Sequence, residues 1–154
     1  MKNMTDSTHH KTDDMRREKL VQFIKYCLVG VLNTAVTFCV IYFCKSFLGW
    51  NLYVCNILGY IAGVTNSFLC NKSWVFKSKG GYTREAIRFL VGFLICYLLQ
   101  LWVVWAITSK SDFGKLDFMI AGIVISGYGI ATVLGNVVYT LANFVYNRTV
   151  TFRN

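Results

Sequence analysis

The distribution of apolar residues divides the chain into long uncharged segments separated by short charged ones. Four segments carry no charged residue, namely 26–44, 46–71, 89–109 and 118–147, and they are 19, 26, 21 and 30 residues long. The hydrocarbon core of a bilayer is about 30 Å thick and a helix rises about 1.5 Å per residue, so about 20 apolar residues cross it. The pattern therefore predicts four transmembrane helices, at about 23–46, 50–71, 87–109 and 118–146.

Composition agrees with an all-α integral membrane protein. Of the 154 residues, 55% are hydrophobic and 15% are charged, whereas about 25% of the residues in an average soluble domain are charged. Residues 1–20 mix acidic and basic side chains with few apolar ones, which predicts a disordered cytoplasmic tail. Residues 21–154 are then expected to form one four-helix transmembrane domain.

Charge asymmetry predicts the orientation of the helices. With the amino terminus inside, the cytoplasmic segments hold 13 of the 16 basic residues, and the outer loops hold only Lys45, Lys110 and Lys115. By the positive-inside rule, both termini are expected in the cytoplasm. The net charge of +9 comes from residues at helix ends and not from one binding face. This placement favours contact with anionic membrane lipids over the binding of nucleic acid.

Cysteine, histidine and glycine patterns predict no cross-link, metal site or cofactor. The six cysteines lie inside or at the edges of the apolar segments without a Cys-x-x-Cys pair, and we expect them to be small apolar side chains. His9 and His10 are neighbours in a polar tail, which is a poor ligand set. Gly80 and Gly81 predict a flexible turn between helices. Because no nucleophile and base pairing is evident, we expect no enzyme activity.

A short motif occurs twice, at the ends of the second and fourth apolar segments. Residues 71–77, NKSWVFK, align with residues 147–153, NRTVTFR, at an offset of 76. The shared pattern is Asn, a basic residue, a hydroxyl, two variable positions, Phe and a basic residue. Residues 28–30 and 90–92, both Leu-Val-Gly, match near the starts of the first and third segments. The sequence therefore predicts two parallel helical hairpins related by an axis along the membrane normal.

Small residues recur every four positions in the second and fourth predicted helices. Such stripes let helix backbones approach closely in lipid. We expect these two helices to cross each other at these faces. The packing positions are Gly59, Gly63, Gly127 and Gly135.

Amides and cations gather at the cytoplasmic ends of the spans, while no ionisable side chain lies deep within one. In one interpretation, the amides bond neighbouring helices to each other for about 0.6–2 kcal/mol each. In the other, they and the cations hold an anionic phosphate headgroup. The candidate headgroup residues are Lys25, Asn33, Asn66, Asn71, Lys72, Arg88, Asn143, Asn147 and Arg148. Aromatic anchors at the membrane interface are expected at Trp74, Phe76 and Phe152.

The order of these motifs resembles the GtrA-like family of small four-helix membrane proteins. The motifs are FIKYCLVG at 23–30, NSFLCNKSWVF at 66–76 and NFVYNRTVTF at 143–152. Val150 departs from the family pattern, which favours Trp there. The resemblance implies a role in moving, or helping to move, polyprenyl-phosphate-linked sugars across the bacterial cytoplasmic membrane for glycosylation of surface polysaccharide or teichoic acid.

Two other functions stay open on the sequence. A membrane anchor or regulator of a partner glycosyltransferase would act through the basic loop that contains Lys72, Lys77, Lys79 and Arg84. A small multidrug-type transporter needs a buried carboxylate, which the predicted spans lack. Four helices also form a thin wall for a transport path, so a homodimer is a further expectation.

Overall fold

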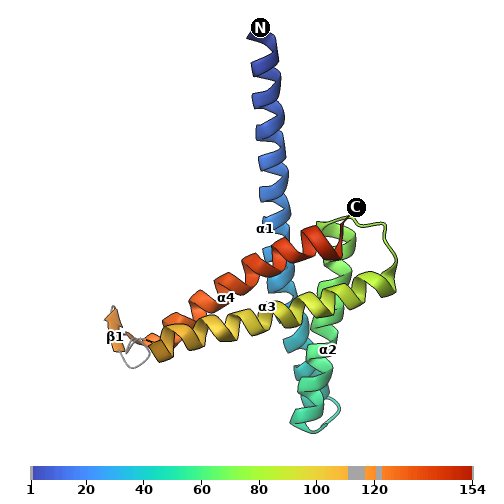
Figure 1. Cartoon of the computed structure of the whole chain (residues 1–154). Helices are drawn as coiled ribbons and strands as arrows, with labels where there is room; N and C mark the ends of the chain where they lie inside the picture. The colour runs from blue at the N-terminus through green and yellow to red at the C-terminus, as the bar shows by residue number, and fades with distance from the viewer. Residues whose placement is uncertain (1, 111–116, 121–122, 154) are drawn as a thin grey trace. The chain divides into compact units, whose positions relative to one another are not determined.

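The protein is described by a computed structural model that covers residues 2–110, 117–120 and 123–153. Its α-helices are α1 (Lys2–Ser46), α2 (Leu52–Cys70), α3 (Tyr82–Lys110) and α4 (Gly127–Tyr146) (Figure 1). Two π-helical turns, η1 (Asn71–Val75) and η3 (Asn147–Thr151), continue α2 and α4, and two strands, β1 (Asp117–Ile120) and β2 (Ile123–Ser126), precede α4.

Four helices in the described part of the chain are long and apolar enough to cross a membrane. They are Asp13–Ser46, Leu52–Val75, Tyr82–Ser109 and Gly127–Thr151. Large apolar side chains such as Val31, Phe38 and Tyr53 are 66–81% exposed, and a bilayer supplies the apolar surroundings that such surfaces need. The predicted four-helix, all-α membrane fold is confirmed, while the predicted orientation of the termini stays a prediction.

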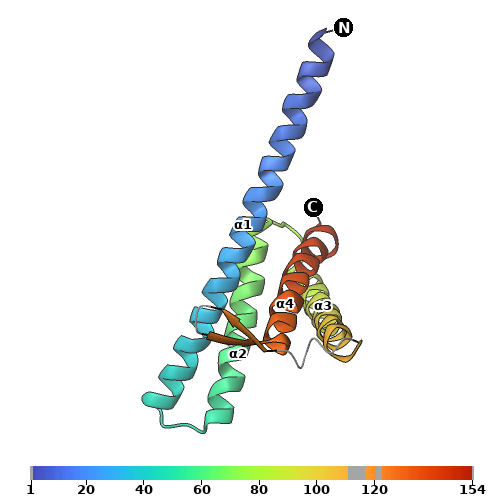
Figure 2. The ribbon, with the colours of Figure 1, turned by 90° about the vertical axis from the view of Figure 1, so that its left-hand side faces the viewer.

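The chain divides into two compact units, Met1–Lys79 and Gly80–Asn154, and each unit contains one helical hairpin. In the first unit α1 and α2 lie side by side (Figure 2). Gly49, with a φ of +65°, turns the chain between them, a conformation that glycine adopts without steric cost. Asn51 caps α2, because its side-chain oxygen accepts a hydrogen bond of 2.9 Å from the amide of Tyr53.

The glycine stripes pack inside each hairpin. A Cβ added at Gly59 would lie 3.0 Å from the Thr37 carbonyl oxygen on α1, and one added at Gly63 would meet the Thr37 hydroxyl. A Cβ at Gly135 would lie 2.7 Å from Cγ2 of Val104 on α3, and Gly127 is buried at the start of α4. Within each unit these stripes face the other helix of the same hairpin, while the expected crossing of the second and fourth helices stays a prediction. Each of these helices packs against the one before it in the chain, as consecutive elements usually do.

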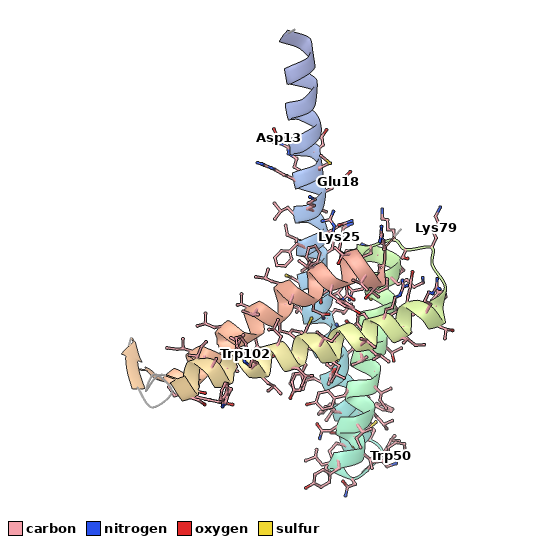
Figure 3. The ribbon with its side chains drawn as sticks, in the orientation of Figure 1. Asp13, Glu18, Lys25, Trp50, Lys79 and Trp102 are labelled. Atoms are coloured by element: carbon pink, nitrogen blue, oxygen red, sulfur yellow. The ribbon has the colours of Figure 1, made fainter. Side chains whose placement is uncertain are left out.

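The first helix extends further towards the amino terminus than composition predicted. Residues 2–20 continue α1 as helix instead of forming a disordered tail, and Figure 3 shows Asp13 and Glu18 on the part of α1 that projects past the end of α2. Once the transmembrane part of α1 has formed, each residue added to the helix gains a hydrogen bond without a new nucleation cost. Polar composition alone therefore does not end this helix.

The fourth helix begins at Gly127, whereas uncharged composition predicted a start near residue 118. β1 and β2 form an antiparallel pair in which Asp117 faces Ser126 and Ile120 faces Ile123. The two strands are rich in aromatic and β-branched residues, which favour extended backbone. Ser126 then caps α4, because its Oγ accepts a hydrogen bond of 3.1 Å from the amide of Gly129.

Candidate functional site

The two copies of the repeated motif adopt the same local structure. At Asn71 and at Asn147 the α-helix widens into a π turn, in which the amide of Phe76 donates to the Asn71 carbonyl at 2.9 Å and the amide of Phe152 donates to the Asn147 carbonyl at 2.8 Å. Both asparagines are buried, at 1% and 0% exposure. π turns are rare in proteins, and those that occur often lie at functional sites. These two turns are therefore the core of the candidate site.

In the first hairpin, the start of the apolar part of α1 packs on η1. Lys25 Nζ lies 5.5 Å from the centroid of the Trp74 ring, which is cation–π geometry. The Tyr26 and Phe76 ring centroids are 6.4 Å apart. Figure 3 shows Lys25 at the end of this hairpin opposite to Trp50. A cation and an aromatic pair therefore connect α1 to the first π turn.

The second hairpin repeats this arrangement with different chemistry. Arg88 Nη1 donates to the Val150 carbonyl oxygen at 3.3 Å, and the Phe89 and Phe152 ring centroids are 6.2 Å apart. Val150 occupies the position of Trp74 in the repeat and offers no aromatic face. The guanidinium therefore bonds to the backbone of η3.

Near the starts of α1 and α3, the residues that are equivalent in the structure differ by one position from those that the sequence alignment pairs. Lys25 and Arg88, which play matching roles, are 63 residues apart, whereas the matching Leu-Val-Gly triplets are 62 apart. A Cβ added at Gly30 would meet no described residue beyond its own stretch of α1 within 4 Å, whereas one added at Gly92 would overlap the Tyr146 ring. The two glycines therefore occupy different positions in their hairpins, and the identical triplets are not structural equivalents.

Two of the predicted headgroup amides bond to each other. Asn66 Nδ2 donates to Asn33 Oδ1 at 2.7 Å and so connects α2 to α1. Asn66 Oδ1 also lies 3.6 Å from the Cys70 thiol. Because the Asn33 oxygen is the acceptor in this pair, its NH2 group remains the end that donates. The pair thus combines the two interpretations, since it connects the helices and still presents amide donors.

In the second hairpin, a different pair of amide side chains connects the two helices. Gln100 Nε2 donates to Asn136 Oδ1 at 2.7 Å, which connects α3 to α4. Asn143 is buried and is bonded along its own helix, because its Nδ2 donates to Tyr139 Oη at 3.3 Å and its Oδ1 accepts from Asn147 Nδ2 at 3.2 Å. The hairpins therefore resemble each other at the π turns and differ between the helices.

The predicted cations are differently exposed. Lys72, the second residue of η1, is buried at 4% exposure, and its carbonyl accepts a hydrogen bond of 2.9 Å from the amide of Ser78. Arg148, at the matching position of η3, is half-buried, and Arg88 is exposed. Within the first unit, Lys25 and Lys72 both belong to the end that carries η1. The interface anchors divide in the same way, since Trp74 is exposed whereas Phe76 and Phe152 are buried.

Glu85 is a buried carboxylate that the sequence interpretation missed. It lies in the first turn of α3 at 3% exposure, and its amide donates to the Gly81 carbonyl at 3.1 Å. A Cβ added at Gly80 would overlap the carboxylate oxygen. Gly80 thus allows a close approach and is not simply flexible. An acidic residue in a first helical turn, where the helix dipole favours negative charge, was the available signal.

The Asn33 and Asn66 pair leads to a stability prediction. Asn33→Leu and Asn66→Leu will together destabilise the protein by less than the sum of the single effects, with a coupling of about 0.6–1.7 kcal/mol. The measurement is a double-mutant cycle on the free energy of unfolding in micelles. The control pairs Asn33→Leu with Asn56→Leu, because Asn56 Nδ2 donates to the Leu52 carbonyl of its own helix. Additive effects of Asn33 and Asn66 would contradict the pair's role.

Four apolar helices, arranged as two hairpins with matching π turns, define a small multi-pass membrane protein. Residues 25–152 match the family described as GtrA/DPMS, transmembrane domain. The chain belongs to this family, as the order of its motifs implied.

Three curated relatives align with 54–88% of this chain. A protein of Listeria innocua named "Cell wall teichoic acid glycosylation protein GtcA" is 23% identical over 140 residues, 88% of each chain. A protein of the same name from Listeria monocytogenes is 19% identical over the same shares. A Bacillus subtilis protein named "Uncharacterized membrane protein YngA" is 32% identical over 96 residues, which are 54% of this chain and 62% of that protein.

Proposed function

We propose that this protein moves polyprenyl-phosphate-linked sugars, or helps another protein to move them, across the bacterial cytoplasmic membrane for glycosylation of a cell-surface polymer. The names of the GtcA relatives support this proposal, since they refer to glycosylation of cell wall teichoic acid. The single structural observation that carries it is the end of the first hairpin, where Lys25 lies beside Trp74 of the π turn and the Asn33–Asn66 pair connects the helices nearby.

The chemistry of this end suits a phosphate that enters from one leaflet. A phosphate accepts several hydrogen bonds and needs a cation to balance its charge. In the first unit, Lys25 provides a charge beside Trp74, and Asn33 has an NH2 group that its bond to Asn66 leaves as a donor. The exposed apolar surfaces of α1 and α2 would contact the polyprenyl chain.

The test of this proposal is the identity of the lipid that co-purifies with the protein. We expect mass spectrometry of the gently extracted protein to show polyprenyl phosphate or its hexose conjugate. The Lys25→Gln, Asn33→Leu double variant should lose this lipid and retain bulk phospholipid. If the wild-type protein co-purified with bulk phospholipids only, as the double variant should, the proposal would be overturned.

A second candidate function is an anchor or regulator of a partner glycosyltransferase. Three exposed cations favour it, namely Lys77 and Lys79 between η1 and α3 and Arg84 in the first turn of α3. Lys77 also has an uncommon φ of +50°. An anchor would lose cell-wall glycosylation when these three residues are changed to Gln and would tolerate Asn33→Leu. In the same glycosylation assay, the translocation proposal predicts that Asn33→Leu loses activity and that the triple Gln variant retains it.

A further inference from the structure

We propose that the π turns recognise the sugar and not the phosphate, because the buried amide oxygens of Asn71 and Asn147 each accept a hydrogen bond from a sugar hydroxyl. This inference rests on the proposed function, since it assigns the part of the lipid-linked sugar that contacts each turn. It also divides the candidate headgroup residues by chemistry, with cations and amide donors for the phosphate and amide acceptors for the sugar.

The orientation of the Asn71 amide is fixed by its partners. Asn71 Nδ2 lies 2.8 Å from the Ser67 carbonyl oxygen. A carbonyl oxygen only accepts hydrogen bonds, so the group that faces it must be the NH2 and not the oxygen of the amide. The same nitrogen lies 3.3 Å from Ser67 Oγ. The Asn71 oxygen therefore points away from Ser67.

This oxygen has no donor in the part of the chain that the structure describes. Asn71 Oδ1 is buried and accepts no hydrogen bond from a described residue, and Asn71 as a whole is 1% exposed. Buried polar atoms are nearly always hydrogen-bonded, and each exception calls for an explanation. Ser73 and Trp74 in the same turn are exposed, so the turn that contains this acceptor borders the surface from which a ligand could approach.

The missing partner must be a hydrogen-bond donor. The phosphate diester of a lipid-linked sugar carries no proton and presents only acceptor oxygens, which an amide oxygen would repel. A sugar hydroxyl donates readily. Asn71 is thus unsuited to the phosphate role that the sequence interpretation gave it, and suited to the group attached to that phosphate.

The second hairpin shows the same feature independently. Asn147 Oδ1 is likewise buried without a hydrogen-bond partner among the described residues, and so is Thr151 Oγ1 four positions later. Both residues are nearly inaccessible, at 0% and 1% exposure. Val75 stands at the position in η1 that Thr151 occupies in η3. Each π turn therefore begins with an acceptor for which the described residues provide no donor, and the second turn has a hydroxyl in addition.

The test is a binding experiment on the full-length protein in nanodiscs of phosphatidylcholine, which contains no hydrogen-bond donor in its headgroup. Its ligands are a polyprenyl-phosphate hexose, its monodeoxy analogues and sugar-free polyprenyl phosphate. Asn71→Leu, which removes the acceptor, should bind the hexose lipid about three- to tenfold more weakly and the sugar-free lipid unchanged. The matched control is Ser73→Ala in the same turn, because Ser73 Oγ is occupied with the Leu69 carbonyl at 2.6 Å.

The deoxy analogues make the test independent of how well the variant folds. One analogue should bind the wild-type protein more weakly by about the same factor, and Asn71→Leu should not distinguish it from the parent. Equal binding of all analogues by the wild type would overturn the inference and leave the proposed function standing. The same conclusion would follow if Asn71→Leu weakened the binding of the hexose lipid and of the sugar-free lipid equally. A wild-type protein that binds neither lipid would overturn both.

Discussion

Replacing Gly59 with leucine will lower the free energy of unfolding by about 1–3 kcal/mol. The added side chain would start 3.0 Å from the Thr37 carbonyl oxygen and 2.6 Å from Cγ1 of Ile41, both on α1. The backbone oxygen cannot rotate away, so α1 and α2 must separate. This separation also lengthens the hydrogen bond between Asn33 and Asn66 near the π turn.

The matched control for this prediction is Gly30→Leu. Gly30 is exposed on α1, and a Cβ added there would meet no described residue beyond its own stretch of α1 within 4 Å. Leucine is a better helix former than glycine, so this variant should be neutral or more stable by up to about 1 kcal/mol. Unfolding in mixed micelles, followed by circular dichroism, compares the two variants. Equal destabilisation by both would contradict the packing of α2 on α1.

Replacing Lys25 with glutamine will weaken the binding of polyprenyl phosphate by about tenfold. Hydrogen bonds to charged groups contribute about 1.5–3 kcal/mol, and the half-buried position of Lys25 favours the lower part of this range. Because the lost group is a cation, the sugar-free lipid should be affected as much as the sugar-bearing one. This result separates the role of Lys25 from that of Asn71.

Lys45→Gln is the control for the loss of charge. Lys45 is the same residue type on the same helix, exposed near the end that is remote from η1. We expect its substitution to change the affinity for polyprenyl phosphate by less than twofold at about 0.15 M salt, where exposed charges are strongly screened. If both lysines contributed equally, the lipid would be attracted by the net charge and not by a site.

The sequence predicted the parts of the fold that depend on hydrophobicity alone. The ends of α1 at Ser46 and of α4 at Tyr146 agree with the expected 46 and 146. The polar pair Lys45 and Ser46 closes the first apolar segment, and Asn147 and Arg148 follow the fourth helix. The start of α4 was not predicted, since residues 118–126 are as uncharged as the helix that follows. Length and charge do not distinguish a short apolar strand pair from the beginning of an apolar helix.

The candidate site was predicted as a set of residues but not as a set of roles. The two copies of the repeated motif coincide with η1 and η3, because similar local sequences adopt similar local structures. Composition could not show that the oxygen of Asn71, and not its NH2, is the unpaired end, because that depends on which atoms surround it. Similarly, the matching triplets at Gly30 and Gly92 suggested an equivalence that three-dimensional packing does not support.

The most direct test of the central claim is transport by the purified protein in liposomes. A fluorescent or radiolabelled polyprenyl-phosphate hexose is placed in one leaflet, and its appearance in the other is followed with an impermeant quencher or enzyme. We predict that transfer accelerates in proportion to the amount of wild-type protein and that Lys25→Gln slows it while Lys45→Gln does not. Transfer no faster than in protein-free liposomes, even with the partner glycosyltransferase added, would contradict the account.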